Sequence, residues 1–207
     1  MTQESLPFGE IAGASPEALG LLMLRTDLHA ARLDDRTQLA AVSDALADGA
    51  ATARDLRRRF PGLTPRKIAG ELQVPVVTTD HDPLVGTIWR FAEYRPRPPQ
   101  IVLYTRGLAP VEHVLARTPA KRLLGEASVQ DVLVAHELYH HAETIRPEMP
   151  IARRYQATIF QIGTLRWRTG ISTLAEIAAG SFAQVLLDLP CHPKVLDFLA
   201  RDGIGRA

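Results

Sequence analysis

The sequence predicts an α+β protein in which a small sheet packs on a histidine-bearing helix and a helical region precedes both. Three observations lead to this class. Residues 16–60 are rich in alanine and leucine, which favour helices. Residues 87–94 and 100–105 are rich in β-branched and aromatic side chains, which favour strands. Residues 128–146 and 172–188 have the three- and four-residue apolar spacing of helices.

The N-terminal part is expected to be a loose tail, residues 1–15, followed by helices at 16–33 and 35–60. Pro61 and Gly62 then interrupt the helical pattern. We therefore assign residues 1–63 to a tail and helical region and residues 64–207 to a second domain, a division that allows both parts to pack as one compact unit.

The segment after residue 63 is expected to form a short helix and then a hairpin. Thr64 followed by Pro65 is a typical helix start, and this helix should reach residue 73. The β-rich stretches 87–94 and 100–105 flank the run Arg-Pro-Arg-Pro-Pro, which predicts two paired strands with a stiff loop. Residues 157–167 predict a further strand or hairpin.

The most informative motif is His-Glu-Leu-Tyr-His at residues 136–140. Ser128 and Asp131 lie three residues apart, as in a capping box, and predict that a helix starts just before the motif. On this helix His136 and His140 are one turn apart and continue the apolar stripe, so both imidazoles should point inward. The motif is therefore expected on a buried helix face.

Two imidazoles at this spacing can bind one divalent ion, and Glu137, about 100° further round the helix, can face a water bound to that ion. The competing interpretation is a pair of core histidines satisfied by hydrogen bonds. We favour the metal because two inward histidines beside a carboxylate are costly to bury without one.

A catalytic zinc normally has three protein ligands, so a third is expected elsewhere. The best candidate is Glu176, because Ala179 and Gly180 share its helix face and let that helix approach closely. Glu176 could instead close a capping box with Thr173. Glu143, on the same face as the histidines, is the rival ligand, although one straight helix rarely offers three ligands good tetrahedral angles.

These residues resemble the ImmA/IrrE family of compact gluzincin-type metallopeptidases. The likeness lies in His136-Glu-x-x-His140, in Glu176-x-x-Ala179-x-x-Phe182-Ala183-x-x-Leu186-Leu187-x-x-Pro190, and more weakly in residues 65–76, 86–94 and 100–104. It implies a zincin-like (minigluzincin) fold, with a small antiparallel or mixed sheet on the zinc helix and Glu176 as third ligand. It also implies peptide cleavage, often of a transcriptional regulator. The extra segment 149–170 and Gly180 depart from the family pattern.

The function expected from the motif is zinc-dependent hydrolysis of peptide bonds in a peptide or protein substrate, with one Zn²⁺ per chain. His136, His140 and Glu176 would be the metal ligands and Glu137 the general base. Tyr155, Arg166 and Arg168 are candidates for a second oxyanion donor only because they lie between the two ligand helices. Residues 100–106 are expected to be a sheet edge to which substrate adds as a strand.

A regulator that binds DNA is the alternative. Residues 51–73 have the spacing of a helix-turn-helix and a basic surface, and the zinc site would then serve structure or sensing. We favour a solvated basic helix face instead, because no base-reading side chains are evident. The six basic residues are Arg54, Arg57, Arg58, Arg59, Arg66 and Lys67.

Composition indicates a globular protein of the cytoplasm without a membrane partner. The chain has 207 residues, 46% of them hydrophobic, and a formal net charge of +1, so no strong field for nucleic acid or membrane is expected. The acidic N-terminus does not resemble a signal peptide. Cys191 is the only cysteine, which excludes an internal disulfide. Composition carries no prediction of oligomeric state.

Overall fold

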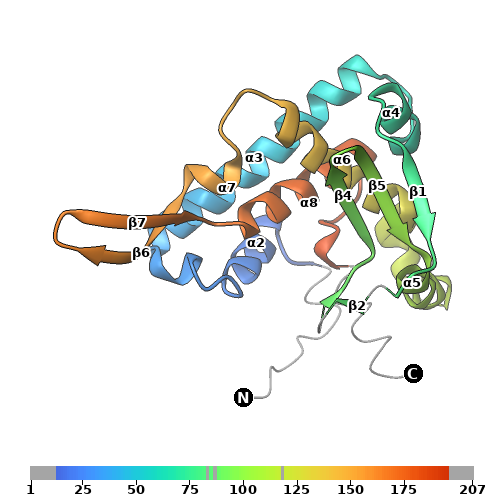
Figure 1. Ribbon diagram of the computed structural model, residues 1–207. Coiled ribbons are helices and arrows are strands. Elements are labelled where there is room, and N and C mark those ends of the chain that lie inside the picture. The colour runs from blue at the N-terminus through green and yellow to red at the C-terminus, as the bar shows by residue number, and fades with distance from the viewer. Residues whose placement is uncertain (1–12, 83, 86–87, 118, 196–207) are drawn as a thin grey trace.

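The computed structural model describes residues 13–82, 84–85, 88–117 and 119–195, and Figure 1 shows it as a ribbon. The α+β class is confirmed: helices form most of the body, and small mixed and antiparallel sheets lie beside them. None of the helices in this described part is both long and apolar enough to span a bilayer. The predicted tail at residues 1–15 falls almost wholly outside the described residues.

The helix expected at 16–33 is wrong in its second half. Helix α2, Pro16–Leu24, ends early, and a short 3₁₀ turn, η1, follows at Ala30–Arg32. The carboxylate of Asp27 accepts hydrogen bonds from the backbone N–H groups of His29 (2.8 Å) and Ala30 (3.1 Å). An aspartate that bonds nearby backbone in this way competes with continued helix.

The next two helices are confirmed. Helix α3, Asp35–Arg59, begins where the side chain of Asp34 accepts a 2.7 Å hydrogen bond from the backbone N–H of Thr37. Helix α4, Pro65–Glu71, has its proline in the first turn, where the missing N–H costs nothing.

The main sheet has three strands in the order β1-β5-β4. Strand β5, Pro99–Tyr104, pairs antiparallel with β4, Ala92–Pro96, which confirms the predicted hairpin. On its other side β5 pairs in parallel with β1, Val76–Thr79. The expectation that residues 100–106 form a sheet edge is therefore wrong, because β1 covers the side that we expected to be free.

Part of the stretch 87–94 forms a separate ribbon. Strand β3, Ile88–Trp89, pairs with β2, Leu84–Val85, and does not continue into β4. Helix α5, Thr105–Arg117, follows β5 directly, and a 3₁₀ turn, η2, follows at Pro119–Leu124.

The C-terminal half contains the two helices on which the site depends, α6 at Val129–Ile145 and α8 at Thr173–Leu187. A short helix, α7 at Ile151–Arg154, lies between them in sequence. It leads into a hairpin of β6, Gln156–Ile162, and β7, Leu165–Gly170, so of the strand or hairpin expected at 157–167 the structure has the hairpin. The hairpin projects from the body (Figure 1).

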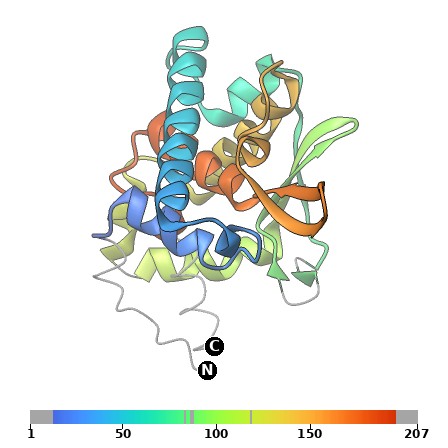
Figure 2. The same ribbon diagram turned by 90° about the vertical axis from the view of Figure 1, so that its left-hand side faces the viewer.

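Helices from both halves of the chain build one core. Helix α3 runs along α8, and α6 lies between α8 and the main sheet (Figures 1 and 2). Buried side chains of α3, α6, α8 and β5 belong to a single hydrophobic cluster. Helices α2 and α3 thus supply one wall of the core around the site.

Candidate metal centre

Helix α6 positions the His-Glu-x-x-His motif, and its start is fixed by the predicted capping box. The hydroxyl of Ser128 accepts a 3.1 Å hydrogen bond from the backbone N–H of Asp131, and the carboxylate of Asp131 accepts a 3.0 Å bond from the backbone N–H of Ser128. Val132, Ala135 and Leu138 of the same helix are buried. This packing holds His136 and His140 in place on the helix.

Helix α8 brings Glu176 to the two histidines. The Nε2 atom of His136 lies 3.1 Å from Oε2 of Glu176, and the Nε2 atom of His140 lies 3.5 Å from Oε1. The two Nε2 atoms are 3.3 Å apart. His136, His140 and Glu176 therefore form a group that could hold a metal ion.

The separation of the two imidazole nitrogens agrees with a tetrahedral site. An ion about 2.0–2.1 Å from each of three donors at tetrahedral angles puts the donors about 3.3–3.4 Å apart. The two imidazole nitrogens are 3.3 Å apart, which equals this value, while the 3.1 and 3.5 Å separations from Glu176 are measured to its two different oxygens, Oε2 and Oε1. Two imidazole nitrogens and a carboxylate oxygen also leave a fourth position open, as in catalytic zinc sites. The spacing of the two histidines and the donor chemistry of the three residues thus fit a zinc ion.

The capping role considered for Glu176 is wrong. Helix α8 has Ser172 at its N-cap, with no side-chain hydrogen bond to the first turn. The hydroxyl of Thr173 instead donates a 2.9 Å hydrogen bond to Asp27, near the end of α2. Glu176 is left to face the histidines.

Glu143, the rival ligand, is used elsewhere. Its carboxylate accepts a 2.9 Å hydrogen bond from the backbone N–H of Ile151 and lies 3.6 Å from the guanidinium of Arg146. It thereby ties the end of α6 to the start of α7. Among the described residues, the group of possible ligands contains Glu176 and not Glu143.

The electrostatics of the ligands suit metal binding. Burial and the charge of His136 lower the pKa of His140 to about 4, so its imidazole is neutral at pH 7. Burial alone would raise the pKa of Glu176, but the hydrogen bond to His136 and the charges of both histidines lower it to about 2. A neutral imidazole and an ionised carboxylate are the forms that coordinate a metal.

Glu137 is held beside this group in a dry environment. It is only 7% exposed, and burial raises its pKa to about 7, although the charge of His136 and a hydrogen bond from the backbone N–H of Tyr94 act in the opposite direction. A carboxylate whose pKa is close to neutral can both accept and release a proton at pH 7.

Tyr94 links the main sheet to the motif helix in a second way. Its hydroxyl lies 3.0 Å from Nδ1 of His141, a buried side chain on α6. Strand β4 and helix α6 are therefore fixed to each other at Glu137 and again one turn further along the helix at His141. Nothing in the local sequence around Tyr94 indicated this contact.

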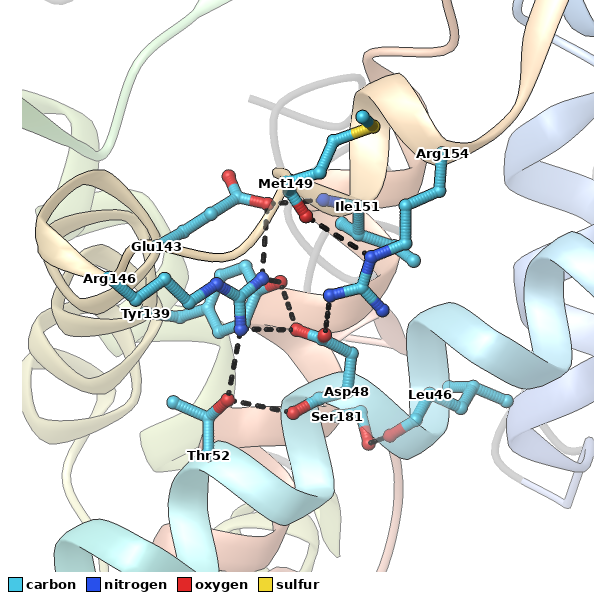
Figure 3. Close-up of polar contacts among 10 residues, drawn as sticks. All are labelled: Leu46, Asp48, Thr52, Tyr139, Glu143, Arg146, Met149, Ile151, Arg154 and Ser181. Atoms are coloured by element: carbon cyan, nitrogen blue, oxygen red, sulfur yellow. Dashed lines mark hydrogen bonds and ion pairs between the residues drawn. The ribbon is translucent and has the colours of Figure 1, made fainter.

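A second cluster that sequence reasoning missed is centred on Asp48 of α3 (Figure 3). Its carboxylate accepts hydrogen bonds from the hydroxyl of Tyr139 (2.8 Å) and from the guanidinium groups of Arg146 (2.9 Å) and Arg154 (2.8 Å). Tyr139 stands next to His140, and their rings meet edge to face at 5.9 Å. The cluster therefore fixes the second half of α6 to α3 and α7.

The candidates for a second oxyanion donor, Tyr155, Arg166 and Arg168, lie against α3 and β6. The hydroxyl of Tyr155 donates a 2.7 Å hydrogen bond to Asp44 of α3. Arg166 and Arg168 are exposed on β7, opposite Gln161 and Thr158 of β6. No catalytic role is therefore assigned to these three residues.

No family model, curated protein or solved structure matches this chain. The resemblance to the ImmA/IrrE family remains a prediction from the motifs, and the assignment of function rests on the geometry of the site.

Proposed function

We propose that this protein is a zinc-dependent metallopeptidase. The observation that carries the proposal is the group of His136, His140 and Glu176, whose two imidazole nitrogens lie 3.3 Å apart as around tetrahedral zinc, with the buried carboxylate of Glu137 next to His136 on the same helix. A structural zinc site would have four protein ligands, whereas the described residues offer three here.

Each side chain then has a definite task. A zinc ion bound by the three ligands would activate water and polarise the scissile carbonyl. Glu137 accepts the proton of the attacking water at its carboxylate and delivers it to the leaving amine, a double task that suits a pKa near 7. The N–H of Tyr94 orients this carboxylate throughout.

The free edge of β4 supports a peptide as the substrate. Phe91 accepts a ladder hydrogen bond from the N–H of Tyr104, so by antiparallel alternation the backbone groups of Ala92 and Tyr94 point away from β5. The outward N–H of Tyr94 bonds to Glu137, which places this edge beside the site. An extended peptide added to the edge at Ala92 would bring its carbonyl groups close to Glu137.

The alternative of a DNA-binding regulator has less support. Residues 51–59 are the end of the 25-residue helix α3, not a separate short helix. Arg57 donates to the carbonyl of Val185, and Arg66 to that of Val76, so part of the basic set serves the fold. Salt-dependent binding to duplex DNA would revive this alternative.

Peptide cleavage by the zinc-loaded protein is the direct test, with a mixture of unstructured peptides as probe and Glu137→Gln as the matched variant. We expect the wild type to cleave and Glu137→Gln to bind zinc as tightly but to be at least 100-fold slower, because the variant lacks only the base. Equal rates for both proteins would refute the role of Glu137 and the proposed mechanism.

A further inference from the structure

The hairpin of β6 and β7 carries an apolar surface that nothing in the described structure covers. Its side chains are 55–69% exposed although all four are large and apolar. We call this set the hairpin face; its members are Phe160, Ile162, Leu165 and Trp167.

The register of the hairpin puts these four side chains on one side. Phe160 lies directly opposite Trp167, and Ile162 directly opposite Leu165. Directly paired residues share a face, and residues two apart along a strand do so too. The four therefore form one continuous ladder of two cross-strand pairs.

The other side of the hairpin is polar. Gln161 pairs with Arg166, and Arg168 lies opposite Thr158. Strands that alternate in this way are typical of sheets that bury one face and expose the other to water. A two-stranded hairpin in water is also marginal unless its apolar face is packed. The hairpin thus has the pattern of a partly buried sheet, and no second layer covers it among the described residues.

The base of the hairpin is fixed, so the face is presented in a defined direction. The guanidinium of Arg32 donates to the backbone carbonyls of Thr158 (2.9 Å) and Ile159 (3.3 Å). Gly170, at the other strand end, lies so close to the carbonyl of Ala152 that a side chain there would collide with it. From this base the strands project beyond the helices (Figure 1).

We propose that the hairpin face binds the same face of a second copy of this chain. Two such hairpins can stack face to face as a small sandwich, with apolar ladders inside and polar sides outside. The contact is self-complementary, as a twofold dimer requires. The hairpin side chains on the buried side carry no charge, so stacking brings no like charges together. The proposal is independent of the metal site.

The area of the face suits a weak, reversible dimer. Side chains of this size that are more than half exposed offer on the order of 100 Å² each, so two copies would bury on the order of 800 Å² through these four residues alone. Specific but transient interfaces lie near the lower end of the range, below about 1,200 Å². We therefore expect a weak dimer that dissociates on dilution.

Charge placement favours a second copy over a lipid surface. The segment from 149 to 175 has four arginines and no acidic residue, which would suit anionic lipid if the arginines flanked the apolar side chains. Arg166 and Arg168 instead lie on the opposite side of the hairpin. A hairpin that laid its apolar face on a bilayer would turn these two arginines away from the head groups.

Sedimentation equilibrium of the full chain tests the proposal, with Phe160→Ser/Trp167→Ser as the variant. We expect the wild type to pass from monomer to dimer as its concentration rises, and the variant to dimerise at least tenfold more weakly. Because these side chains are largely exposed, the variant should fold as the wild type does. Leu63→Ser is the matched control, since Leu63 is also exposed but lies in the turn between α3 and α4; it should dimerise normally.

The fluorescence of Trp167 provides a second readout. The chain has two tryptophans, so Trp89→Phe leaves Trp167 as the only reporter. Its emission should shift to the blue over the same concentrations at which dimer forms. A monomer at every concentration up to about 1 mM would overturn the proposal. So would dimerisation that the hairpin variant leaves unchanged, or a blue shift seen only with phosphatidylcholine–phosphatidylserine vesicles.

Discussion

Gly49 of α3 lies directly against the backbone carbonyl of Ala178 in α8. A Cβ atom at residue 49 would overlap this carbonyl, and the backbone N of Phe182 would be only 3.0 Å from it. The two helices approach closely because residue 49 has no side chain. Since α8 carries Glu176 and α3 carries Asp48, this contact helps to set where the third ligand stands.

Gly49→Ala should therefore destabilise the protein by about 2 kcal/mol or more, because two backbones would have to separate. Gly70→Ala in α4 is the matched control: a Cβ there meets nothing within 4 Å. In a helix this control should stabilise by roughly 0.5–1 kcal/mol. Urea unfolding of both variants measures the difference, and equal stabilities would contradict the close packing.

Asp48→Ala should cost about 3–5 kcal/mol, because it leaves two arginines and the hydroxyl of Tyr139 without their shared acceptor. The control is Asp55→Ala, which breaks an exposed ion pair with Arg58 on the same helix and should change stability by less than about 1 kcal/mol. Thermal unfolding of the two variants measures whether the Asp48 cluster stabilises the protein by this amount. Similar melting temperatures for the two variants would show that it does not.

Glu137→Gln should make the metal-free protein more stable at neutral pH. Burial raises the pKa of Glu137 from 4.5 to about 7, so the folded state holds this proton more tightly than the unfolded state does. The contribution of this bound proton to the free energy of unfolding is complete below about pH 4.5 and is lost as the pH rises through about 7. Glutamine cannot ionise, so the variant should gain about 3 kcal/mol over the wild type near pH 8 and almost nothing near pH 4. A gain independent of pH would contradict the raised pKa.

Ala92→Pro tests the edge of β4 as the substrate strand. Residue 92 points its N–H away from β5, so proline removes an outward donor and no ladder bond. We expect zinc content and folding to be kept while kcat/KM for peptides falls at least about tenfold, the effect of one lost backbone contact that is made with the substrate. Unchanged cleavage would place the substrate elsewhere. Val102→Pro, in the central strand β5, should instead unfold the sheet.

The local parts of this structure could be predicted from the sequence. Ser128 and Asp131 mark the start of α6 because a capping box lies within four residues. Pro65 marks the start of α4 because proline is favoured at the first position of a helix. The β-rich composition of residues 157–167 indicated a strand or hairpin there. The His-Glu-x-x-His spacing indicated one helix face, and small residues near Glu176 indicated that α8 could approach it.

The parts that depend on distant residues could not be predicted. Strand β1 pairs in parallel with β5, although more than twenty residues separate the two strands in sequence. Nothing in the sequence near residue 100 therefore indicated that β1 occupies the second edge of β5. Asp48 sits in an alanine-rich helix whose spacing does not show that arginines from α6 and α7 converge on it. The break after Leu24 depends on Asp27, which also holds Thr173 of α8.

The zinc content of the purified, untagged chain tests the central claim most directly, measured beside Glu176→Gln and Glu143→Gln. The site predicts about one zinc per chain in the wild type and in Glu143→Gln, and a sharp loss in Glu176→Gln. No zinc in the wild type after zinc has been added back, or full zinc in Glu176→Gln, would contradict the three-ligand site.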